Sequence, residues 1–165
     1  MMKKISLAIV LLAFIVPIFG QTNCKIKKAS AYYTSSAPGM QMVDDNGYPV
    51  PPKMTIDRFI YIELTSRKKP EIVTVLYNTT VLSVTLTAVE GNKAVLGSNF
   101  ANNPDFNVQA KKCNSLWKLD LYTVDGKDMP ELDCKDISIN IKNEDGTTCT
   151  FKISNESRLN LLPRY

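Results

Sequence analysis

The chain has 165 residues, 44% of them hydrophobic, with a formal net charge of +4 and no histidine. Such a mild positive charge gives no support to nucleic-acid binding. The lack of histidine excludes a Ser-His-Asp triad, a histidine-assisted cysteine nucleophile and a histidine-ligated metal.

Residues 1–20 have the pattern of a secretory signal peptide. Lys3 and Lys4 precede an apolar stretch at residues 5–19, which is short for a membrane span, and Pro17 would end its helix before the cleavage point. A retained membrane anchor is the alternative interpretation. We expect export to the periplasm or the extracellular space, leaving a single domain at residues 21–165 with no further membrane span.

Strand patterns begin at residues 25–34. Residues 35–53 follow as a long loop rich in Pro, Gly and Asp, which favour turns. Three apolar, β-branched runs at residues 58–64, 71–77 and 80–89 form the centre of the chain. In the third run apolar and polar residues alternate with a period of two, which is typical of a half-buried strand. The short connectors between the runs predict antiparallel neighbours.

The second half of the chain continues the strand pattern. A hairpin turn at residues 90–92 leads into residues 93–96. Residues 97–115 are ambiguous between a helix start and a loop entering a strand; we favour the loop. Residues 116–124 predict a strand with Trp117, Leu119 and Leu121 inward. Residues 137–142 and 149–153 alternate as a β-hairpin, and residues 159–162 form a last strand or a packed tail.

About eight short strands and little helical pattern predict an all-β fold. The arrangement expected is an antiparallel β-sandwich, immunoglobulin-like in the broad sense. Tyr61 and Tyr77 are interpreted as strand residues with a buried ring and a solvated hydroxyl.

The four cysteines after the signal peptide are Cys24, Cys113, Cys134 and Cys149, and an even number in an exported domain predicts two disulfides. No C-x-x-C pair is present, so a structural zinc is not expected. The hairpin register puts Cys149 opposite about Asn140, several residues of ~3.3 Å each from Cys134, unless Cys134 folds back in its loop. Three connectivities are possible, and this argument disfavours one of them; of the other two we favour Cys24–Cys149 with Cys113–Cys134.

The motifs of common enzymes and cofactor sites are missing. No glycine-rich phosphate-binding motif occurs, and most carboxylates lie beside Gly or Pro in turn sequences. The segments 44–47 and 143–146 carry oxygen ligands near a glycine but lack the spacing of a calcium-binding loop. No cofactor or metal is expected. The lysines of residues 67–69 and 111–112 are interpreted as solvated loop or edge charges.

Two segments are candidate binding loops. The first is residues 35–53 and the second is residues 97–109, and their candidate binding residues are Met40, Met42 and Tyr48 in the first and Phe100, Asn102, Asn103, Asp105 and Phe106 in the second. Aromatic side chains beside amides suit both sugars and protein partners. We predict an exported, non-catalytic module that binds another protein. A carbohydrate-binding module using residues 97–109 is the alternative, and a carboxylate-dependent hydrolase ranks third.

Overall fold

The computed structural model describes residues 24–36, 42–51, 54–96, 107–127, 129, 136–143 and 145–159. Strands account for 65% of these residues, and no α-helix occurs among them, so the all-β prediction is confirmed. The strands are β1 (Ile26–Ser36), β2 (Met42–Val43), β3 (Pro49–Val50), β4 (Thr55–Leu64), β5 (Glu71–Tyr77), β6 (Thr80–Ala88), β7 (Lys93–Val95), β8 (Asn107–Gln109), β9 (Ser115–Thr123), β10 (Ile137–Lys142), β11 (Thr148–Ile153) and β12 (Glu156–Leu159). A short 3-10 turn, η2 (Glu90–Asn92), precedes β7.

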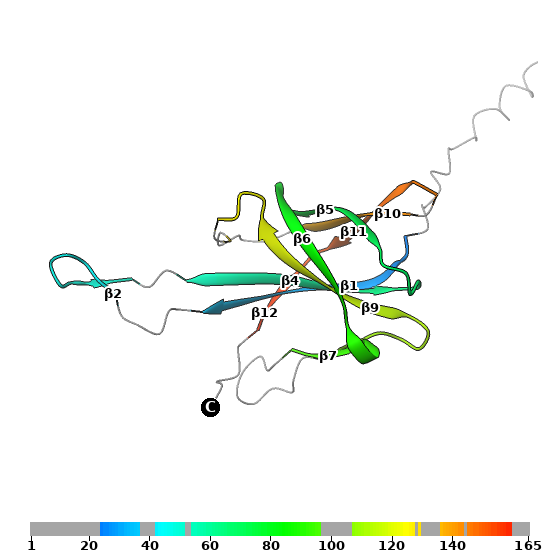
Figure 1. Cartoon of the computed structure of the whole chain (residues 1–165), viewed down its shortest axis with the longest axis horizontal. Helices are drawn as coiled ribbons and strands as arrows, with labels where there is room; N and C mark the ends of the chain where they lie inside the picture. Colours follow the sequence, from blue (N-terminus) through cyan, green and yellow to red (C-terminus); the bar gives the residue numbers. More distant parts are fainter. Residues whose placement is uncertain are drawn as a thin grey trace, which may run out of the picture.

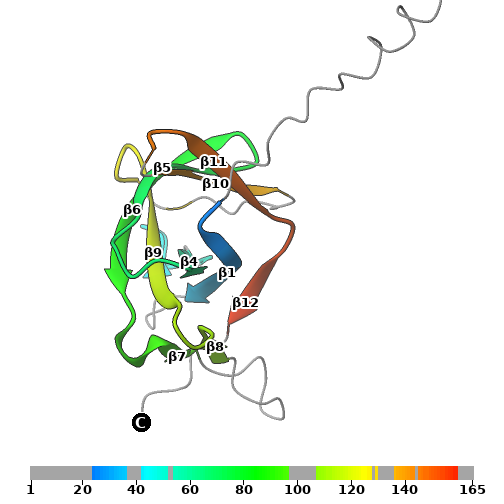
Figure 2. The same cartoon turned by 90° about the vertical axis from the view of Figure 1, so that its right-hand side faces the viewer.

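Eight of the strands form one sheet in the order β11-β10-β5-β6-β9-β4-β1-β12. The neighbours are antiparallel except β1 and β12, which run parallel. Figure 1 shows the long strands crossing one another, and Figure 2 shows the same strands arranged around a central core. The hydrogen bonds therefore join these strands into one strongly curled, mixed sheet. The immunoglobulin-like sandwich, which needs two separate packed sheets, is not confirmed.

The two outermost strands of the sheet are consecutive in the chain. β11 and β12 are separated only by residues 154–155, so together they act as one bent strand that joins β10 to β1. The disulfide Cys24–Cys149 joins residues 125 apart in sequence, and each pair between β1 and β12, such as Ala31 with Glu156, has the same separation. The disulfide therefore continues the register of the β1–β12 pairing toward the other end of β1.

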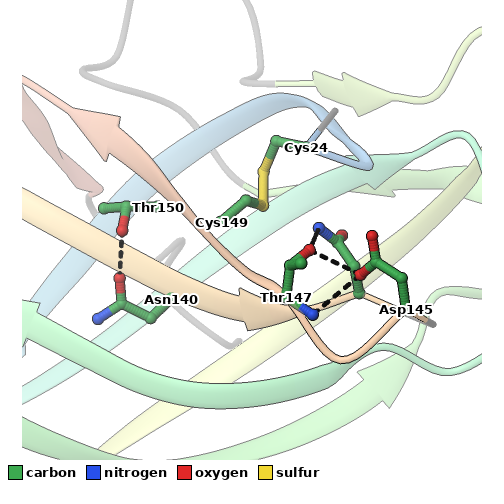
Figure 3. Close-up of a disulfide and its surroundings, with 7 residues drawn as sticks. Cys24, Asn140, Asp145, Thr147, Cys149 and Thr150 are labelled. Atoms are coloured by element: carbon green, nitrogen blue, oxygen red, sulfur yellow. Dashed lines mark hydrogen bonds between the residues drawn. A yellow bond between two sulfur atoms is a disulfide. The ribbon is translucent and has the colours of Figure 1, made fainter. Parts of the chain in front are cut away.

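The predicted pair Cys24–Cys149 is confirmed, with a Cα–Cα distance of 5.5 Å (Figure 3). That spacing is close to the separation of neighbouring strands. On the far side of β11, Thr150 donates a hydrogen bond from its hydroxyl to Oδ1 of Asn140 on β10, at 2.6 Å. The covalent bond and the hydrogen bonds thus hold β11 between β10 and the start of β1.

The core fills the inside of the curl. Alternate residues of the strands point inward, as their pleat requires, and they come from both ends of the strand order. The innermost of these side chains are at most 1% exposed: Ile60, Ile62, Leu64, Val75, Tyr77, Leu119, Ile137, Ile139 and Ile141. Trp117, Leu119 and Leu121 lie in the same cluster, which confirms the predicted inward face of this strand.

A second apolar cluster lies on the opposite face of β4. Tyr61 and Tyr32 pack there with Val108, Leu116 and Leu159, and Phe59 lies beside them. The paired strands β7 and β8 contribute to this cluster, so the β7–β8 hairpin covers part of the outer surface of the sheet. β4 is consequently buried on both faces over residues 60–64, which agrees with the continuous apolar run at residues 59–62.

Two predicted strand pairings were wrong. β4 and β5 are joined by the short segment 65–70, yet β4 pairs with β1 and β9, whereas β5 pairs with β6 and β10. The connector therefore crosses one end of the curled sheet and does not form a hairpin. Similarly, β6 pairs with β9, while β7 turns away to pair with β8. A short connector limits the distance between the ends of the two strands that it joins. It does not determine that these strands pair with each other when the sheet curls on itself.

Candidate binding surface

The β2–β3 hairpin lies beyond the ends of β1 and β4, where Ser36 pairs with Thr55 (Figure 1). Within the hairpin Met42 pairs with Val50, and Val43 pairs with Pro49. No other labelled element lies beside the hairpin in Figure 1. This part of the predicted 35–53 loop is therefore a projecting two-stranded unit.

Asp44 organises the turn of this hairpin. Its Oδ1 accepts hydrogen bonds from the backbone N–H groups of Asn46 at 2.9 Å and Tyr48 at 2.8 Å. Its own N–H donates to the Tyr48 carbonyl at 2.8 Å, and its carbonyl accepts from the Gly47 N–H at 2.9 Å. Gly47 adopts a φ of +81°, which suits a residue without a β-carbon. Four hydrogen bonds at one aspartate give the turn a defined shape before any partner arrives.

The hairpin exposes apolar side chains that a soluble domain would ordinarily bury. The exposed fractions are 58% for Met42, 59% for Val43, 69% for Tyr48 and 40% for Val50. Met42 lies opposite Val50, and Tyr48 precedes Val50 by two residues, so these three share one face. Clustered, exposed apolar side chains on a projecting element are typical of interaction surfaces.

A basic pocket of about 200 Å³ lies at the other end of the β1–β4 pair. The pocket takes in Leu64, the last residue of β4, and Lys25, just before β1. Its other lining residues are Ser66, Lys68, Lys69, Pro70, Glu71, Ile141, Lys142 and Asn143. Four ammonium groups against one carboxylate make its lining positively charged.

Hydrogen bonds tie the lysine-bearing connector to the sheet. The Thr65 N–H donates to the Lys25 carbonyl at 3.2 Å, and the Ser115 hydroxyl donates to the Ser66 carbonyl at 2.5 Å. The Lys68 N–H donates to the Ser66 hydroxyl at 3.2 Å. The charges of Lys68 and Lys69 are exposed, as predicted for loop lysines, but they stand on an anchored segment.

The negative charges near the pocket are few. Lys142 Nζ lies 3.3 Å from Glu71 Oε1, and both side chains are largely exposed, so this ion pair contributes little stability. Asp145, in the β10–β11 turn, is close enough to Lys25 to interact electrostatically. Its Oδ1 is already occupied by the hydroxyl and N–H of Thr147, as Figure 3 shows. Among the described residues near the pocket, the four lysines outnumber these two carboxylates.

A polar cluster lies inside the curl, where sequence reasoning did not expect one. Arg58 Nε lies 3.2 and 3.3 Å from the two carboxylate oxygens of Glu156, and their side chains are only 2% and 5% exposed. The Tyr77 hydroxyl donates to Glu156 at 3.1 Å, and the guanidinium carbon lies 5.6 Å from the centre of the Tyr77 ring. The solvated hydroxyl predicted for Tyr77 is therefore wrong, because this residue is fully buried.

The cluster has a structural role, because it attaches β12 to the interior. Burial raises the pKa of Glu156, and the Arg58 charge and the Tyr77 hydrogen bond offset this only in part. The signal for this pair is present in the sequence. Arg58 shares the inward alternation of Ile60 and Ile62, and an arginine on a core-facing row requires a buried counter-charge.

Glu63 plays a comparable role on the outer face of β4. Its carboxylate accepts hydrogen bonds from the Lys111 N–H at 2.9 Å and the Asn114 side chain at 2.5 Å. Burial alone would raise the pKa of Glu63, but these hydrogen bonds and the charges of Lys111 and Lys28 lower it below its ordinary value. Glu63 thereby fixes the turn that carries Cys113, whose φ is +77°.

The structure separates the predicted site residues into two groups. Met42 and Tyr48 lie on the exposed hairpin, and Cys113 is exposed and forms no disulfide within the part of the chain that the structure describes. The others lie outside the described residues: Met40, Phe100, Asn102, Asn103, Asp105, Phe106 and Cys134. The pair Cys113–Cys134 and the second binding loop therefore stay predictions.

Two further features concern the described ranges of the chain. No group of three or more His, Cys, Asp or Glu side chains is placed to hold a metal ion there. That part of the chain also contains no helix long and apolar enough to cross a membrane.

Comparisons with known proteins give no relative. No protein-family model, no curated protein and no solved structure matches the chain significantly. Function must therefore be inferred from the surfaces described above.

Proposed function

We propose that this protein is an exported, non-catalytic module that binds another protein through its β2–β3 hairpin. The observation that carries the proposal is the exposed apolar face of Met42, Tyr48 and Val50. Loops carried on a rigid β scaffold are common binding elements. The expected likeness to immunoglobulin-like domains enters the proposal only in this respect.

The turn favours binding because it is already ordered. A hairpin fixed by the hydrogen bonds of Asp44 loses little conformational freedom when it docks. Tyr48 is the expected anchor, since tyrosine offers a large amphipathic surface with few rotatable bonds. Truncating a central anchor of this type reduces affinity by about 2 kcal/mol or more, which is roughly a 30-fold loss.

Export and the lack of catalysis belong to this proposal as well. Both rest on the sequence: the pattern of residues 1–20 supports export, and the missing histidine and enzyme motifs support a binding role. The carbohydrate-binding alternative depends on residues 97–109, of which only Asn107, Val108 and Gln109 are described. It remains the second candidate because residues 97–109 combine aromatic side chains with amides, which suit sugars.

The test is site-specific photo-crosslinking in cells that export the protein, with the crosslinker at position 48. A discrete polypeptide adduct is expected, and the Val50→Asp change should abolish it by placing a charge on the same face. The matched control is Tyr122, a tyrosine on β9 that is 51% exposed and is not part of the hairpin.

A crosslinker at position 122 should give no such adduct. Purified Tyr48→Ala and Tyr122→Ala variants should unfold at the same urea concentration as the unmodified chain, because both positions are exposed. Equal adducts from positions 48 and 122 would contradict the proposal. A polysaccharide adduct at position 48 would also contradict the proposal, because the ligand of the hairpin would then be a carbohydrate and not a protein.

A further inference from the structure

The described residues of the β2–β3 hairpin and of the pocket lining carry opposite charge. At the hairpin end, Asp44 and Asp45 are both exposed, and residues 42–51 contain no lysine or arginine. At the pocket end, four lysines line the cavity with a single glutamate. Among the described residues, the hairpin is therefore acidic and the lining of the pocket is basic.

Both ends also have an apolar centre. The hairpin presents Met42, Tyr48 and Val50 beside its acidic turn. The pocket is lined by Leu64, Pro70 and Ile141 between its lysines. An apolar centre with a charged rim is the usual composition of a protein interface, and rims of opposite sign favour association.

The hairpin cannot reach the pocket of its own chain. β4 alone has 10 residues, so at ~3.3 Å per residue the two ends of the pair lie about 30 Å apart. A contact between two different surfaces of identical chains is heterologous. Where the rotation that relates neighbouring copies does not close into a ring, such contacts produce an open head-to-tail filament.

We propose that the partner of the hairpin is a second copy of this chain, with the acidic hairpin of one copy seated in the basic pocket of the next. This inference rests on the proposed function, since it names the partner of the same hairpin. In the assembly Tyr48 enters the apolar centre of the pocket, and Asp45 faces the lysines on its rim. Asp44 keeps its hydrogen bonds within the turn.

The contact is small, and its strength should reflect that. A ten-residue hairpin buries less than the roughly 1,200–2,000 Å² typical of stable complexes. We therefore expect a dissociation constant in the micromolar range or higher. Exposed rim charges are screened within about 8 Å at physiological ionic strength. Association should therefore weaken several-fold between about 50 mM and 500 mM salt.

The experiment is sedimentation velocity on the purified, oxidised mature chain over a concentration series up to about 1 mM. Two charge variants are compared. Asp45→Lys with Asn46→Lys makes the hairpin basic while leaving Asp44 in place, and Lys68→Glu with Lys69→Glu makes the pocket acidic. Each variant alone should remain monomeric, because its two ends then carry charges of the same sign.

Mixing the two variants should restore association, since each then meets an end of opposite charge. Lys93→Glu with Lys152→Glu is the matched control: both lysines are exposed and neither lines the pocket, so this variant should associate like the unmodified chain. Restoration by mixing is an outcome that misfolding of either variant would not produce.

Two results would overturn the inference. One is an unmodified chain that stays monomeric at about 1 mM in low salt. The other is association that the single charge variants leave unchanged. If the chain is monomeric but position 48 still crosslinks to a different polypeptide, the self-association fails while the proposed binding function stands. If position 48 captures no polypeptide, both fail together.

Discussion

Removing the Cys24–Cys149 disulfide should lower the stability of the domain by several kcal/mol. The bond closes a loop spanning 125 residues. The chain-entropy relation for a loop of this length gives about 5 kcal/mol at 25 °C, because the crosslink restricts the unfolded chain. The substitution Cys24→Ala with Cys149→Ala avoids leaving a polar group at position 149, which is only 2% exposed.

Urea unfolding followed by the fluorescence of Trp117 measures this loss, since Trp117 is the single tryptophan and lies in the core. With a urea dependence of about 2 kcal/mol per molar, the midpoint should fall by about 2.5 M. The control is Lys152→Ala, at an exposed position on β11 where little change is expected. A fall of less than about 0.5 M for the double variant would refute the reasoning. The β1–β12 pairing would then hold the sheet closed without the bond.

Two other predictions concern buried carboxylates. Arg58→Met should destabilise the fold by about 3–5 kcal/mol at pH 7 by leaving Glu156 buried without its counter-charge, whereas adding Glu156→Leu should restore most of the loss; urea unfolding measures both. The defect of the single variant should shrink toward pH 4, because protonation removes the buried charge, and a constant defect would contradict this. Glu63 has a lowered pKa, so its stabilisation is present above about pH 4.5 and is lost as the pH falls through its folded-state pKa. Glu63→Gln should therefore be less stable than the unmodified chain at pH 7 and approach it at pH 3.

Alternation in the sequence was sufficient to predict most strands. The predicted runs at residues 71–77 and 137–142 match β5 and β10 residue for residue. The hairpin register also placed Cys134 too far from Cys149, which reduced the candidate partners of Cys149 to Cys24 and Cys113; Cys24, the favoured one, is the partner in the structure. In each case the deciding information is local: side-chain period, turn residues and the reach of a strand.

The order of the strands could not be predicted in the same way. The pairings of β4 with β9 and of β1 with β12 connect residues far apart in sequence, and no local signal specifies them. The buried Arg58–Glu156 pair depends on that order, since it exists only once β12 lies beside β1. The basic pocket likewise forms only because the connector at residues 65–70 crosses the end of the curl.

The pairing of the first strand with the last has a consequence for how the chain folds. β1 can pair with β4 early, but its other edge has no partner until β12, about 125 residues later, is available. Contacts so distant in sequence slow folding, because much of the chain must be ordered before they form. Formation of the Cys24–Cys149 bond should consequently be a late event. Its appearance during refolding would report that the sheet has closed.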